Sequence, residues 1–154
     1  MTGSSPNPYV TRDQDSLRKV YAETGSIAVI GASQNAAKAA HRIPRYLQEQ
    51  GYRIVPVSPR GGEILGEHAY PTLEDVDVPI DVVDVFRPPA EAASIARSAI
   101  EFGAKVLWFQ PGTHSDEGIY LAAAAGLTVV AYRCMGGTHG RLGLGPGPTK
   151  SRKS

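Results

Sequence analysis

Short apolar runs recur along the chain, and segments of helical periodicity separate them. The runs predict strands near residues 26–30, 52–57, 80–86, 105–109 and 127–131. Apolar residues three and four apart predict helices between them. These helices start at Asp15 or Ser16, lie within residues 37–50, follow Pro88-Pro89 and follow Ser115. Strands without polar alternation, separated by helices, indicate a parallel sheet covered on both faces. We therefore predict an α/β fold, a Rossmann-like, doubly wound, three-layer structure with about five parallel strands.

Proline and glycine residues interrupt this pattern. Pro44 lies inside the second helical segment, so that helix either starts just before Pro44 or is kinked there. Gly61, Gly62 and Gly66 predict an irregular excursion after the second strand, and residues 72–75 predict a short capped turn.

The composition of the two ends differs from that of the middle. We predict a flexible tail over residues 1–14, one domain over residues 15–140, and a disordered basic tail over residues 141–154.

Composition indicates in which compartment the protein acts and which classes of partner it lacks. The formal net charge is +1, so no global field draws the chain to nucleic acid or to a membrane surface. The single cysteine, Cys134, cannot form an internal disulfide, which fits a reducing compartment. No apolar run approaches the roughly 18 residues of a membrane span, and the first residues do not read as a signal peptide. These features predict a cytoplasmic protein without nucleic-acid or membrane partners.

The chemistry is expected where the strands end. The first strand runs into Gly31-Ala32-Ser33 ahead of a helix, which is where doubly wound proteins cradle phosphate. Lys38 and Arg42 open that helix, and Arg60 and Arg87 follow the second and third strands. Singly, each cation is a solvated surface charge; together they suit a ligand with several phosphates. The competing interpretation of the glycine turn is a tight strand–helix connection without a ligand.

The second strand argues against a nicotinamide dinucleotide. It ends in Ser58-Pro59-Arg60, where an NAD enzyme would usually carry an acid for the ribose hydroxyls. The second and third glycines of the NAD fingerprint are missing as well, and no Walker A loop is present. A flat wall for adenine could come from Pro56, Pro59, Val85 and Phe86, although Phe86 fits core packing equally well.

Catalytic candidates are few. Asp84 lies in a buried strand, where a structural hydrogen bond is the expected role. The four histidines show no metal-ligand spacing with Cys134, which could be a reactive thiol or an inert buried one. We predict no catalytic residues and no metal site, and a protein that binds a nucleotide without evident catalytic machinery.

Several segments, taken in order, resemble the stand-alone CoA-binding proteins, whose fold matches the CoA-binding domain of succinyl-CoA synthetase α-subunits. The resemblance rests on Ile27–Ser33, Arg45–Tyr52, Val55–Arg60, Leu65–Glu67, Asp81–Arg87, Trp108–Gly112 and Arg133-Cys134. It departs from the family at Ser58, where Asn is frequent, and over Met135–His139, where the family tends to have Leu-Lys-x-Glu-His.

The resemblance implies a Rossmann-like fold that binds coenzyme A or an acyl-CoA. It implies that Gly31, Ala32, Ser33 and Lys38 meet the pyrophosphate, and that Ser58, Pro59 and Arg60 flank the adenosine. Val85, Phe86 and Arg87 would line the adenine side, and Gln110, Pro111 and Gly112 would face the pantetheine. A homo-oligomer or a partner enzyme is the setting we consider for such a module.

Two alternatives stay open. One is an NAD(P)-linked oxidoreductase or another nucleotide-binding Rossmann protein, in which Arg60 could accept a 2′-phosphate. The other is an interaction protein whose binding site has decayed, supported by the altered segment after Cys134.

Overall fold

A single parallel sheet organises the chain, as shown by a computed structural model that describes residues 7–147. Its five strands lie in the order β2-β1-β5-β6-β7, and every pair is parallel. The strands are β1 (Ser26–Ile30), β2 (Arg53–Val57), β5 (Val82–Val85), β6 (Val106–Phe109) and β7 (Thr128–Val130). The chain leaves β1 toward β2 and then returns past β1 to β5, so the switch point of the sheet lies between β1 and β5.

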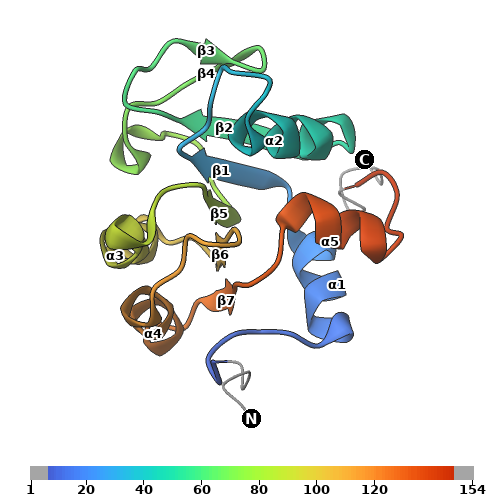
Figure 1. Cartoon of the computed structure of the whole chain (residues 1–154), viewed down its shortest axis with the longest axis vertical. Helices are drawn as coiled ribbons and strands as arrows, with labels where there is room; N and C mark the ends of the chain where they lie inside the picture. The colour runs from blue at the N-terminus through green and yellow to red at the C-terminus, as the bar shows by residue number, and fades with distance from the viewer. Residues whose placement is uncertain (1–6, 148–154) are drawn as a thin grey trace.

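Helices cover both faces of the sheet (Figure 1). On one face lie α3 (Ala92–Phe102) and α4 (Asp116–Ala124); on the other lie α1 (Gln14–Glu23), α2 (Ala39–Glu49) and α5 (Met135–Arg141). Each face has its own buried apolar cluster, which includes Phe109 and Ile119 on the α3–α4 side and Trp108 and Leu47 on the other. The predicted three-layer α/β fold is confirmed.

The start of α1 differs from the prediction, and the start of α2 excludes one of the two alternatives predicted for Pro44. The helix α1 is capped by Asp13, whose carboxylate accepts from the Ser16 amide at 2.9 Å, and not by Asp15 or Ser16. The helix α2 begins at Ala39, so Pro44 is an interior residue and not a first-turn proline. Proline has no amide hydrogen, which leaves the Ala40 carbonyl without its helical donor. The Ser33 amide donates to that carbonyl at 3.3 Å.

Two elements were not expected from the sequence. The glycine-rich excursion contains a small antiparallel hairpin of β3 (Glu63–Ile64) and β4 (Glu67–His68). The helix α5 was missed because glycines, which disfavour helix, make up much of its sequence. Packing stabilises α5: the His139 ring lies edge-on to Tyr21, Tyr46 and Tyr52, with centroids 5.5–5.8 Å away.

The chain lies against the domain on both sides of the predicted boundaries. Val10 is buried, and the Thr11 amide donates to the Val129 carbonyl of β7 at 2.8 Å. After α5, Leu142 and Leu144 pack against the core, and the Gly147 amide donates to the Gln50 carbonyl. The tail predicted over residues 141–154 therefore starts with residues that contact the domain, and residues 148–154 lie outside the described part.

Close packing between α3 and α4 depends on a glycine. A Cβ at Gly118 would lie 3.0 Å from the Ala92 carbonyl oxygen, whereas one at Gly137 in α5 would make an ordinary contact at 3.5 Å. We expect Gly118→Ala to lower the free energy of unfolding by about 1–2 kcal/mol, because the backbone of α3 cannot yield easily. Gly137→Ala should leave it unchanged or raise it by up to ~1 kcal/mol through helix propensity. Urea denaturation of both variants tests this, and equal effects would contradict it.

Candidate ligand site at the carboxyl edge of the sheet

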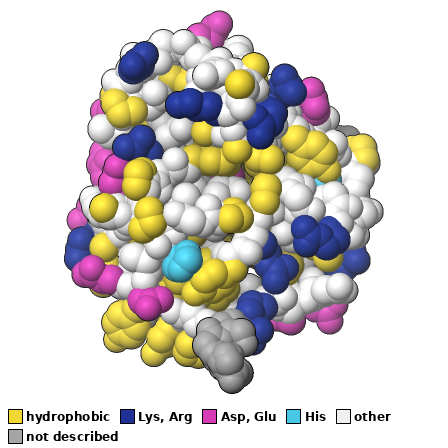
Figure 2. Space-filling model, in the orientation of Figure 1, with side chains coloured by type: hydrophobic (Ala, Val, Ile, Leu, Met, Phe, Trp, Pro, Cys, Tyr) yellow, Lys and Arg dark blue, Asp and Glu magenta, His cyan; other side chains and the backbone are white. Residues whose placement is uncertain are grey.

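The loops that follow β1, β2 and β5 enclose a cavity of about 690 Å³ at the carboxyl edge of the sheet. We call it the phosphate cavity. Its lining includes the predicted residues Gly31, Ala32, Ser33, Lys38, Ser58, Pro59, Arg60 and Arg87, together with Gln34, Asn35, Gly61 and Ile64. Figure 2 shows Lys and Arg side chains gathered over this part of the surface, around a hollow. Residues from separate strand ends thus meet, as the parallel topology predicts.

Ser33 fixes the loop between β1 and α2. Its amide donates to the Ala40 carbonyl, its hydroxyl accepts from the Asn35 amide at 3.0 Å, and its carbonyl lies 2.7 Å from Nδ1 of His41. The Ser33 amide is therefore already occupied. The amides of Ala32 and Gln34 have no hydrogen-bond partner within residues 7–147, so they are the donors that an anion could use.

Gly31 is required by the protein's own packing. Its φ is +90°, and its amide donates to the Val57 carbonyl of β2 at 2.9 Å. A Cβ there would lie 2.8 Å from Cδ of Arg87 and 3.1 Å from the Phe86 carbonyl. Residue 31 is thus glycine because the Arg87 side chain crosses it. Its amide is not free to bind phosphate, which corrects one part of the expected role of the turn.

A smaller pocket of about 250 Å³ adjoins the phosphate cavity. We call it the apolar pocket, because its walls include Ile30, Val57, Pro71, Leu73 and Ile95. Gly31, Pro59 and Arg87 line both spaces, so they form the boundary between them. Sequence reasoning missed this pocket because Pro71 and Leu73 come from the connection between β4 and β5, and Ile95 comes from α3.

Arg87 is held by an ion pair at this boundary. Its Nη2 donates to Oε2 of Glu91 at 2.7 Å, and its Nε lies 3.1 and 3.2 Å from the two carboxylate oxygens. These hydrogen bonds raise the pKa of Arg87 and lower the pKa of Glu91, so both groups are charged at neutral pH. Glu91 lines the apolar pocket.

Other predicted residues lie away from the phosphate cavity. The Val85 side chain is fully buried in the core between the sheet and α3–α4, so it cannot form an adenine wall as expected. Phe86 is half-buried and packs against the opposite face of the sheet. Gln110 and Gly112 follow β6 and line neither space. Arg42, weighed as a phosphate ligand, donates instead to the Ala37 carbonyl.

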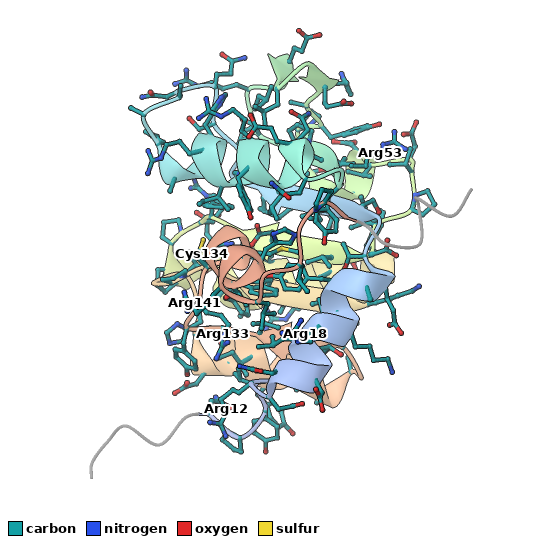
Figure 3. All side chains as sticks on the ribbon, turned by 90° about the vertical axis from the view of Figure 1, so that its right-hand side faces the viewer. Arg12, Arg18, Arg53, Arg133, Cys134 and Arg141 are labelled. Carbon is teal, nitrogen blue, oxygen red and sulfur yellow. The ribbon has the colours of Figure 1, made fainter. Side chains whose placement is uncertain are left out.

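A third strand-end arginine belongs to another face of the molecule. Arg133 follows β7 and lies near Cys134, Arg18 and Arg141, around α1 and α5, whereas Arg53 lies apart (Figure 3). The half-exposed Cys134 thiol caps α5, where its sulfur accepts from the Gly137 amide at 3.4 Å. These residues line neither of the two spaces.

Asp84 is a fully buried carboxyl group in β5. Gln110 donates from Nε2 to one carboxyl oxygen at 2.7 Å, which matches the structural hydrogen bond expected for Asp84. The other oxygen, Oδ2, has no hydrogen-bond partner within the described residues. Burial raises the pKa of Asp84 to about 7, although the hydrogen bond from Gln110 acts to lower it. The carboxyl group therefore stays protonated at pH values well above those at which an exposed aspartate ionises.

Residues 25–140 match the sequence model of the CoA binding domain. The chain belongs to this CoA-binding domain family. The uncharacterised protein YneT from Bacillus subtilis is 32% identical over 123 residues, which cover 80% of this chain and 91% of YneT.

Solved structures and longer relatives agree with the assignment to the CoA-binding domain family. A hypothetical protein from Pyrococcus horikoshii superimposes with a TM-score of 0.83 at 37% identity, over 92% of this chain and 99% of that one. The ADP-forming acetate–CoA ligase of Methanocaldococcus jannaschii is 24% identical over 119 residues. These residues cover 72% of this chain and 17% of the ligase, so this chain corresponds to a fraction of that enzyme.

Among residues 7–147, no three His, Cys, Asp or Glu side chains are grouped so that they could hold a metal ion. None of the helices in that range is long and apolar enough to span a membrane.

The titration of Asp84 should affect folding stability. Its pKa is raised from 3.8 to about 7 on folding, so the native state binds a proton that the unfolded state has lost. The stabilisation that this bound proton provides is present in full below pH 4, and it is lost as the pH rises through about 7. Between pH 5 and pH 8, we expect the unfolding free energy of the wild type to fall by about 2–3 kcal/mol relative to that of Asp84→Asn. Urea titrations at both pH values measure this.

The comparison isolates the effect of the Asp84 proton, because any change in the free energy of unfolding that the asparagine amide itself causes is the same at both pH values. A difference between wild type and Asp84→Asn that stays the same from pH 5 to pH 8 would show that Asp84 does not titrate in this range.

Proposed function

We propose that this protein binds coenzyme A, free or as an acyl-CoA, at the phosphate cavity and the apolar pocket, and that it carries out no reaction by itself. The observation that carries the proposal is the junction of the two spaces. A cavity lined by Lys38, Arg60, Arg87 and free backbone amides opens beside a pocket with apolar walls. Coenzyme A has two parts that match these spaces. Its anionic phosphates suit the phosphate cavity, and the flat adenine base next to them suits the apolar pocket.

The contacts suggest how the ligand would lie. The diphosphate would meet the Ala32 and Gln34 amides and Lys38, because these donors all line the phosphate cavity from the loop between β1 and α2. Adenine would enter the apolar pocket past Pro59, with Ser58 and Arg60 flanking the adenosine. The pantetheine arm would leave the cavity along the sheet edge toward Gln110 and Gly112, which follow β6.

The lining residues support binding in preference to catalysis. Neither space is lined by a histidine or a cysteine, and the acids of the apolar pocket are Glu74 and the ion-paired Glu91. The hydroxyl side chains of the lining make no hydrogen bond to Glu74 or Glu91 within the described residues, so the pairing of a nucleophile with a base that acyl transfer needs is not formed there. Chemistry on the bound ligand would belong to a partner enzyme, to which this module would present CoA.

The competing hypothesis is an NAD(P)-linked protein. It rests on Arg60, which lines the cavity and could accept a 2′-phosphate. Ser58 stands where an acid would hold the ribose of NAD, so this hypothesis favours NADP over NAD.

Isothermal titration calorimetry with CoA, dephospho-CoA, NAD and NADP tests the proposal. We expect CoA to bind most tightly and dephospho-CoA more weakly, since it lacks the 3′-phosphate. Arg60→Gln should weaken CoA binding about tenfold or more, because a charge-assisted contact is lost. Arg53→Gln is the matched control: Arg53 is an exposed arginine at the opposite end of β2, and its loss should change little.

The outcomes separate the hypotheses. Equal affinity for CoA and NAD, or binding to none of the four ligands, would overturn the proposal. Preference for NADP over CoA would support the oxidoreductase alternative. Gly31→Val would not test CoA binding, because a side chain at residue 31 would collide with Arg87 and the Phe86 carbonyl and disturb the fold itself.

A further inference from the structure

Arg87 stands at the only boundary shared by the two spaces of the proposed site within the described residues. Its side chain lines both the phosphate cavity and the apolar pocket, whereas Glu91 lines the apolar pocket alone. The stem of Arg87 crosses Gly31, where it fills the space that a Cβ would need, and the guanidinium lies beyond it.

Glu91 occupies the face of Arg87 that a phosphate would use. The Nε and Nη2 groups both point at the carboxylate, which is the side-on, two-pronged geometry that arginine also adopts with phosphate oxygens. Of the five N–H groups of arginine, those on Nη1 make no hydrogen bond to the described residues. The carboxylate thus stands in for an anionic ligand.

The ion pair is open to exchange. The two side chains are 42% and 43% exposed, and the residues are four apart, across a 3-10 turn. Exposed ion pairs of this kind contribute little to stability, so the fold does not require that Arg87 stay on Glu91. A phosphate with two charges and three oxygens is a stronger acceptor than one carboxylate.

We propose that Glu91 is an internal competitor for Arg87: a phosphate of the ligand takes over the guanidinium on binding, and Glu91 sets the affinity. This inference rests on the proposed function. It makes Glu91 a residue that weakens binding by holding the guanidinium of Arg87, and not only by repelling the anionic ligand.

A double-mutant cycle measured with CoA by calorimetry tests the inference. Arg87→Gln should weaken binding about 10- to 100-fold, because the cation is lost. Glu91→Gln keeps the shape of the side chain and removes its charge, so it should tighten binding about three- to tenfold. In the double variant the gain from Glu91→Gln should vanish, because there is no Arg87 left to release.

The control is Glu117→Gln. Glu117 forms a similar exposed pair with Arg97 at 3.3 Å, in a position that lines neither space. The change in net charge equals that of Glu91→Gln, so a general charge effect would tighten CoA binding equally in both variants. We expect Glu117→Gln to change the affinity by less than twofold.

Three results would overturn the inference. Weaker binding by Glu91→Gln would mean that Glu91 positions Arg87 for the ligand. An equal gain with and without Arg87 would mean that the two residues act independently. An equal gain in Glu117→Gln would reduce the effect to net charge. Wild-type protein that does not bind CoA at all would instead refute the proposed function, which keeps the two failures distinguishable.

Discussion

Three segments meet at the carboxyl end of β1, and they can meet only because residue 31 has no side chain. The Gly31 amide is bonded to β2 through the Val57 carbonyl, and the stem of Arg87 from the end of β5 lies against its Cα. A left-handed φ of +90° turns the chain away from the sheet toward α2. The position of Arg87 and the shape of the boundary between the two spaces both depend on this one backbone geometry.

The role of the glycine is therefore structural before it is chemical. The sequence pattern of a glycine turn after a buried strand indicated a phosphate cradle in which the glycine admits the ligand. In the structure the glycine admits an arginine of the same chain, and the free donors are the amides of Ala32 and Gln34. The pattern therefore located the turn at the edge of the sheet, but it did not show which of its amides the fold leaves free.

Local periodicity predicted the layers of the fold because strands and helices of this sheet each bury a continuous apolar face. Asp13 as a cap was beyond its reach, since a cap depends on backbone angles. The pattern placed α2 within residues 37–50, but it could not decide whether Pro44 lies in the first turn or in the interior. Strand ends brought Arg60 and Arg87 together as expected. Val85 failed as an adenine wall because alternation along β5 points it into the core.

Long-range packing explains the remaining differences. The glycines of α5 argue against helix on propensity, yet Gly136 is buried beside Ile43 of α2, where a Cβ would lie 3.1 Å from the isoleucine. Here small residues permit the close approach of two helices, and that approach holds α5 in place. Only the tertiary structure reveals this use of glycine, as only the tertiary structure reveals the apolar pocket, whose walls come from segments that are far apart in the sequence.

Pro44 has an effect beyond α2. Because it supplies no amide hydrogen, the Ala40 carbonyl is available to the Ser33 amide, and the loop that faces the phosphate cavity is tied to the helix behind it. The entropy lost by ordering that loop is then a cost of folding and not of association. A ligand that bound at this loop would meet donors already in place, so little further ordering of the loop would oppose its binding.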